Sequence, residues 1–142
     1  AKLIEIPLLD KLELFANYTF QDAQFGEGPN DGKDIPMVPQ NQASSGLRTE
    51  FLKDFQFSLT GHYVGSRFAI NDVLNATPPV KPYYVLDSRL AFQKKYFEIF
   101  GEVNNILDNL YSAYVSKSTF SSTKSYFPSP ERNFTVGVNV RF

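Results

Sequence analysis

Side chains that could do acid–base or nucleophilic chemistry are few and far apart in this chain. His62 is the single histidine and there is no cysteine, and no serine and aspartate accompany His62 in the arrangement of a catalytic triad. Glu98 and Glu102 stand four residues apart, about 13 Å in a strand, which is too far for a paired general acid and base. We expect them to pair with Arg89 or other basic residues across neighbouring strands. The sequence therefore predicts a protein that is not an enzyme.

Metal, cofactor and nucleic-acid sites are not indicated either. The stretch Asn30–Asp34 has the composition of a calcium loop, but its spacing does not match an EF-hand. One histidine, one methionine and no cysteine leave few ligands for a soft metal. The net charge of −1 at pH 7 gives no basic field that would attract nucleic acid. We predict no metal, no cofactor and no nucleic-acid partner.

Period-two alternation of apolar and polar residues predicts the elements that must position these side chains. The chain is rich in Phe and Tyr, which favour strands, and no segment keeps a convincing helical period. We expect an all-β, antiparallel up-and-down meander of about six long strands, at Leu12–Phe25, Ser45–Leu52, Phe55–Phe68, Tyr84–Gln93, Tyr96–Asn105 and Asn133–Phe142.

Short and long connections alternate between the expected strands. The short ones are Leu52–Asp54 and Gln93–Lys95, and the long ones are Gly26–Asn41, Asn71–Pro82 and Ser112–Pro130. Successive turns of a meander fall at opposite ends of the sheet, so all the short turns share one end. Outer-membrane barrels show the same asymmetry. Within the last long connection, Ser116–Ser125 is Ser/Thr-rich and is expected to be a mobile surface loop.

The apolar side chains of these strands could face a soluble core or lipid. A nine-residue strand is about 30 Å long and, tilted by about 40°, rises about 23 Å, close to the apolar band of an outer-membrane barrel. A closed soluble barrel needs about eight or more strands. Aromatic residues gather where the band would end, at Phe51, Phe55, Phe92, Phe97 and Phe142 beside the short turns and at Phe20, Tyr63, Tyr84, Tyr111 and Phe134 beside the long loops. These features favour the membrane.

Two stretches resemble the C-terminal motifs of TonB-dependent outer-membrane receptors. Val103–Tyr111, VNNILDNLY, is similar to the family's V-x-N-L-F-D-x-x-Y, with conservative departures at Ile106 and Leu107. The closing stretch FPSPERNFTVGVNVRF is similar to P-G-R-x-F-x-x-G-x-x-x-x-F, with Glu131 in place of the usual Gly. Matches in family order also occur at Ile35–Asn41, Tyr63–Phe68 and Tyr83–Phe92.

The resemblance implies that residues 1–142 are the last strands of an incomplete 22-stranded transmembrane barrel. It implies a receptor in the outer membrane of a Gram-negative bacterium that imports a scarce nutrient, most often a ferric siderophore. The implied partners are the lipid bilayer, the N-terminal plug domain and remaining strands of the same receptor, a TonB-type energy-coupling protein, and the barrel-assembly machinery. The chain start lacks the apolar region of a signal peptide, and is expected to be internal or a mature end.

Ligand contacts are expected from the long loops and upper lumen, at Arg67, Asn71, Asp72, Lys117, Lys124, Tyr126 and Arg132. The closing strand resembles the signal that the assembly machinery reads, at Phe134, Val136, Val138, Val140 and Phe142. Two alternatives stay open, a porin-like barrel fragment and a soluble small-ligand barrel.

The membrane interpretation makes two structural predictions. The sheet should not close on itself, because six strands are too few for such a barrel. One set of residues should lie exposed on the outer, lipid-facing side of the sheet: Leu59, Leu86, Ile99, Val136, Val138 and Val140. A second set should lie on the lumen side: Arg48, His62, Arg89, Glu98, Glu102 and Arg141. A soluble barrel would bury Val138 and expose Arg89.

Overall fold

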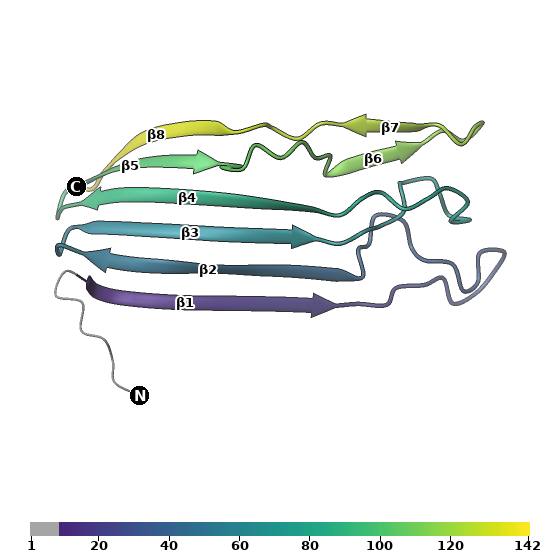
Figure 1. The fold of residues 1–142 in the computed structure, drawn as a ribbon, viewed down its shortest axis with the longest axis horizontal. Helices are drawn as coiled ribbons and strands as arrows, with labels where there is room; N and C mark the ends of the chain where they lie inside the picture. The colour runs from purple at the N-terminus through teal and green to yellow at the C-terminus, as the bar shows by residue number, and fades with distance from the viewer. Residues whose placement is uncertain (1–8) are drawn as a thin grey trace.

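A computed structural model describes residues 9–142 as an all-β structure whose long strands form one sheet (Figure 1). The six strands of this sheet are β1 (Leu9–Phe20), β2 (Asn41–Phe51), β3 (Phe55–Val64), β4 (Tyr83–Gln93), β5 (Phe97–Asn104) and β8 (Asn133–Val140). They pair antiparallel in the order β1-β2-β3-β4-β5-β8. A two-stranded hairpin, β6 (Tyr114–Lys117) and β7 (Lys124–Phe127), lies in the connection between β5 and β8.

The meander of six long strands is confirmed, with corrections at several strand ends. The strand expected to run to Phe25 ends at Phe20, and the one expected to run to Phe68 ends at Val64. Beyond Val64 the chain leaves the sheet, and Arg67 pairs with Val80 inside the loops. The expected mobile loop at Ser116–Ser125 contains parts of β6 and β7, because backbone pairing joins these residues in a hairpin.

The short turns lie at one end of the sheet and the long loops at the other, as expected (Figure 1). In the turn between β2 and β3, Leu52 and Lys53 both have positive φ, 51° and 63°, the backbone pattern that suits a tight hairpin. The Asp10 carboxylate accepts a hydrogen bond from the Lys53 amide at 2.7 Å. The Asp54 carboxylate pairs with Lys94, so the two short turns are held together.

The strand register places the two predicted sets of side chains on opposite faces of the sheet. One row of directly paired residues crosses all six strands on the polar face: Glu13, Arg48, Ser58, Arg89, Glu102 and Thr135. The apolar face carries Val136 and Val138, which are 80% and 61% exposed. Leu59 and Leu86 on the same face are half-buried. A soluble barrel would have packed Val138 inside, so the exposure of Val138 contradicts the soluble-barrel alternative.

Four of the five aromatic residues expected beside the short turns form a band there, whereas Phe142 lies beyond the end of β8 and is fully exposed. Phe51, Phe55, Phe92 and Phe97 follow one another on the apolar face, with successive ring centroids 5.0–6.1 Å apart. At the other end, Tyr111 departs from the expected band. Its ring stacks on that of Tyr83, a polar-face residue, with the centroids 4.5 Å apart.

The sheet is open. β1 and β8 each have a neighbour on one side only, and in residues 9–142 no pairing joins them to one another. The prediction that the strands do not close is therefore confirmed for this part of the chain. The buried apolar cluster lies in the loops, at Ala69, Val80 and Val115, because a single-layer sheet has no second layer to cover it. None of the described residues forms a helix long and apolar enough to cross a membrane.

Candidate functional site

The polar face of the sheet carries an ion-pair network centred on Arg89. Its guanidinium pairs with Glu98 and, at 3.1 Å, with Glu102. Glu98 is 7% exposed and is also approached by Arg141 at 3.8 Å and by the Asn139 amide at 3.4 Å. The expected pairing of the two glutamates with Arg89 is confirmed. A buried carboxylate needs such partners to offset its desolvation, so these groups hold the sheet wall together.

Two phenylalanines on the polar face each cover a glycine on the neighbouring strand. Phe15 lies opposite Gly46, and Phe100 lies opposite Gly137. A Cβ atom at Gly137 would lie 2.4 Å from Phe100 Cζ, so the ring occupies the space that the missing side chain leaves. An arginine then covers each ring, with Arg89 4.5 Å from the Phe100 centroid. The glycines therefore explain why apolar rings stand on a polar face.

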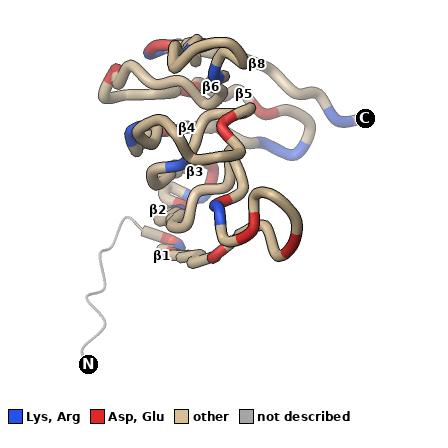
Figure 2. Tube along the Cα trace, turned by 90° about the vertical axis from the view of Figure 1, so that its right-hand side faces the viewer, with Lys and Arg blue, Asp and Glu red and all other residues tan. Residues whose placement is uncertain are grey.

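The long loops form one packed unit, here called the loop lobe, from residues 21–40, 65–82 and 105–132. The Asn75 amide joins two of its segments, donating to the Asp34 carbonyl at 3.0 Å and accepting from the Asp34 backbone N–H at 2.7 Å. Ile70 joins segment 65–82 to segment 105–132, because its N–H donates to the Val115 carbonyl at 2.9 Å. In the view onto the loop end, acidic and basic residues are interspersed along the tube (Figure 2). The lobe thus presents no field of a single sign.

Arg67, one of the expected ligand contacts, is buried in this lobe. Its side chain donates to the carbonyls of Ser112 and Ala113, both at 2.9 Å, and its guanidinium lies 5.3 Å from the Tyr83 ring centroid. Burial lowers the pKa of Arg67, and the nearby Tyr83 opposes that shift. No carboxylate of the described residues pairs with it. Arg67 thus fastens the start of the β3–β4 connection to the segment that leads into β6.

Asp72, a second expected contact, organises a tight turn. Its carboxylate accepts hydrogen bonds from the Ala76 and Thr77 amides, at 2.9 and 3.0 Å, and from the Thr77 hydroxyl at 2.6 Å. Burial alone would raise the pKa of Asp72, but these hydrogen bonds and the charge of Lys117 outweigh it and lower that pKa. The carboxylate therefore stays ionised and its acceptors are occupied within the lobe.

A groove of about 690 Å³ opens between the Pro-rich segment 78–83 and the segments 110–112 and 124–131. Two expected contacts, Lys124 and Tyr126, line it together with Tyr83 and Tyr111. The Lys124 ammonium donates to the Pro78 carbonyl at its rim. The volume of the groove is in the range of small-molecule binding sites. Tyr83 and Tyr111 were not predicted as site residues, and their spacing in the sequence gives no sign that their rings stack.

The remaining expected contacts lie apart from the groove. Asn71 is exposed with φ 68°, and Lys117 in β6 is half-buried. Arg132 hydrogen-bonds to the turn that follows β5. The residues of the expected assembly signal are exposed: Phe134, Val136, Val138, Val140 and Phe142.

Comparison with known proteins bears on this architecture. The family model described as "TonB dependent receptor-like, beta-barrel" matches residues 4–106. Among solved structures, the ferric-catecholate import receptor Fiu from Escherichia coli K12 in its closed form matches 92% of this chain at 23% identity, with a TM-score of 0.74. The siderophore receptor PiuA from Acinetobacter baumannii matches 92% at 19% identity, with a TM-score of 0.73.

The ferric citrate transporter FecA in its unliganded form matches 91% of the chain at 20% identity, with a TM-score of 0.74. The chain spans 19%, 20% and 21% of the lengths of Fiu, PiuA and FecA. These likenesses show a shared fold over about one fifth of each of those chains.

Proposed function

Because the chain belongs to the TonB-dependent receptor β-barrel family, we propose that it forms the last strands of an outer-membrane receptor that imports a ferric siderophore. The exposed apolar face supports this, since lipid accepts side chains such as Val136 and Val138 that water does not. The two open edges support it too, because strand edges within a membrane must pair with further strands. Those strands and a plug domain would belong to the same receptor.

The groove in the loop lobe is the observation that carries the ligand part of this proposal. Its walls combine aromatic rings and prolines with two lysines, Lys81 and Lys124, and one acidic residue, Glu131, so the basic residues outnumber the acidic one. Rings offer flat apolar surface and an ammonium offers a positive charge, a combination that suits a planar, negatively charged ligand such as an iron chelate of aromatic oxygens. Lys124 and Tyr126 are the proposed direct contacts. Arg67 would support the groove wall, because it contacts Ser112 and Tyr83, which line the groove. Asp72 would hold its own turn in the lobe, because its carboxylate is engaged by Ala76 and Thr77.

Energised transport separates this proposal from a porin-like pore. The test is uptake of radioactive ferric siderophore by cells that carry the full-length receptor, with and without a TonB-type energy-coupling protein. We expect accumulation only when the coupling protein is present. Equal uptake in both strains would indicate passive diffusion and would overturn the proposal of active import.

Ligand contact can be tested separately, by the binding of a ferric catecholate to the purified full-length receptor. Tyr126→Ala and Lys124→Ala should each weaken binding about tenfold, the effect of losing a contact worth about 1.4 kcal/mol. Lys33→Ala is the matched control, an exposed lysine of the lobe that does not line the groove. Unchanged affinity in both groove variants would show that the ligand binds outside the groove.

A further inference from the structure

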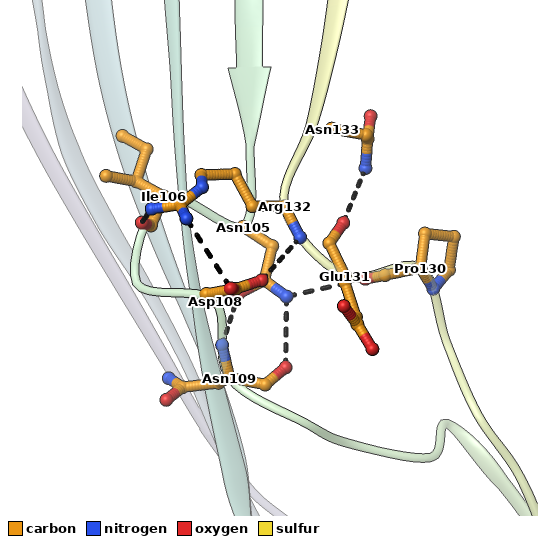
Figure 3. A network of polar contacts seen from close by, with 8 residues as sticks. All are labelled: Asn105, Ile106, Asp108, Asn109, Pro130, Glu131, Arg132 and Asn133. Atoms are coloured by element: carbon orange, nitrogen blue, oxygen red, sulfur yellow. Dashed lines mark hydrogen bonds and ion pairs between the residues drawn. The ribbon is translucent and has the colours of Figure 1, made fainter.

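The turn after β5 and the segment before β8 are joined by a compact network of hydrogen bonds (Figure 3). The Asp108 carboxylate accepts the Arg132 backbone N–H at 2.9 Å. The Arg132 guanidinium donates to the Ile106 carbonyl at 3.3 Å and approaches Asp108 at 3.5 Å. These contacts connect the two C-terminal motifs that stand far apart in the sequence.

Asn105 completes the network from inside. Its side chain is 2% exposed, and its amide donates to the Asn109 carbonyl at 3.0 Å and the Pro130 carbonyl at 3.4 Å. Its Oδ1 accepts from the Asn109 N–H at 3.0 Å. Asn105 and Asp108 have φ of 53° and 55°, a left-handed conformation that Asn and Asp tolerate better than most residues.

The β5–β8 pair needs such a device because the alternation of apolar and polar side chains does not by itself set the register of these two strands. A two-residue slip of β8 leaves every side chain on the same face, so the apolar alternation does not oppose it. The β2–β3 and β4–β5 pairs are each joined by a short turn, and turn geometry sets the register there. β5 and β8 are joined by the long connection that contains β6 and β7, and among residues 9–142 β8 has no second neighbour.

We propose that Asn105, Asp108 and Arg132 form a latch that sets the register of β8 on β5. By doing so the latch fixes the position along the sheet of the outward-pointing backbone groups of β8 at the free edge, where a further strand of the receptor pairs to close the barrel. Asp108 is the central member, because its bond to the Arg132 backbone lies one residue before β8 begins at Asn133. The inference rests on family membership and not on the cargo or on energised uptake.

The Phe100–Gly137 contact opposes the same slip within the strands. After a two-residue slip, Phe100 would face Thr135 or Asn139, whose side chains would enter the space that its ring fills over Gly137. This contact stays intact in the variants that test the latch, so an effect on register can be assigned to the latch itself.

Disulfide trapping in the full-length receptor, freed of other cysteines, measures the register directly. A cysteine pair at Glu102 and Thr135 reports the native register, because these residues face one another. Pairs at Glu102 with Asn133 and at Asn104 with Thr135 report the two possible two-residue slips. The readout is the ratio of native to slipped cross-links in the membrane-inserted receptor.

Asp108→Gly removes the acceptor but keeps the left-handed backbone available, and should lower this ratio about tenfold. That change corresponds to about 1.4 kcal/mol, the size of a lost hydrogen bond. Asp108→Asn keeps Oδ1 and should stay within about twofold of the parent. Lys53→Gly is the matched control, a left-handed residue in the turn at the other end of the sheet, and should leave the ratio unchanged.

An unchanged ratio in Asp108→Gly overturns the proposal, as does an equal fall in Lys53→Gly, which would indicate general flexibility. If Asp108→Gly leaves no inserted receptor, Arg132→Ala decides, because it keeps the backbone N–H and loses only the bond to Ile106 and the exposed ion pair. We expect a fall of about threefold there. If Arg132→Ala lowers siderophore affinity but leaves the ratio of native to slipped cross-links unchanged, Arg132 contacts the ligand and the latch proposal is wrong.

Discussion

Gly137→Ala should destabilise the full-length barrel, whereas Gly101→Ala should not. The two glycines lie on adjacent paired strands but face opposite sides of the sheet. A Cβ atom at Gly137 would lie 2.4 and 2.7 Å from two atoms of the Phe100 ring, and one at Gly101 would meet nothing within 4 Å. The same chemical change is therefore blocked at one position and free at the other.

The size of the effect follows from what holds the Phe100 ring. The ring has little room to swing away, because the Arg89 guanidinium lies 4.5 Å from its centroid and is itself held by Glu98 and Glu102. Adding a methyl group to a filled site costs about 1–3 kcal/mol. Replacing a glycine by alanine where space allows stabilises by about 0.4–1 kcal/mol, by reducing the entropy of the unfolded chain. Because this entropy gain is the same for both variants, we expect them to differ by the packing cost, about 1–3 kcal/mol.

The measurement is urea unfolding of the receptor in lipid vesicles, with the folded fraction read from gel mobility. The Phe100→Leu background provides a double-mutant cycle, since removing the ring should abolish most of the cost of Gly137→Ala. Equal unfolding midpoints for Gly137→Ala and Gly101→Ala would refute the packing argument. A cost that persists in full without the ring would show that the backbone, and not Phe100, resists the alanine.

Three further predictions concern the faces of the sheet and the loop lobe. In the full-length barrel, Val138→Arg should cost about 2–4 kcal/mol and Thr60→Lys much less, because lipid rejects a charge that a wide lumen accepts; equal unfolding costs would contradict this. A spin label at position 138 should be relaxed by lipid-soluble oxygen and one at 139 by an aqueous reagent, and the reverse pattern would exclude the membrane assignment. The Asp72 carboxylate has a lowered pKa, so its stabilisation is complete at neutral pH and is lost as the pH falls below 3.8 and then through that lowered pKa. Pepsin should therefore cleave the loops of Asp72→Asn faster than those of the parent at pH 5, with the difference shrinking towards pH 2, and a constant difference would refute the role of the charge.

Local pattern was enough to determine the strands and their two faces. Alternation at Phe134–Phe142 placed Val136 and Val138 on one side, because the pleat of a strand turns successive side chains to opposite faces. The alternation of short and long connections likewise predicted which end of the sheet carries the loops. Strand ends such as Phe20 and Val64 were less well predicted, because contacts with distant loop residues decide where pairing stops.

The loop lobe depended on contacts that no local pattern encodes. The sequence marked Arg67 and Asp72 as polar loop residues, but burial among segments far along the chain turned both inward. The stacking of Tyr83 on Tyr111 and the hairpin of β6 with β7 arose in the same way.

The C-terminal motifs show most clearly what the sequence determines and what only the tertiary structure decides. The sequence alone displayed Asp108 and Arg132 as members of two separate motifs. The tertiary structure brings the Asp108 carboxylate to the Arg132 amide, because β5 and β8 pair across a long connection and so return their loop ends to the same place. Strand alternation acts between neighbouring residues and can be seen in the sequence, whereas register between distant strands depends on which hydrogen bonds the folded chain completes.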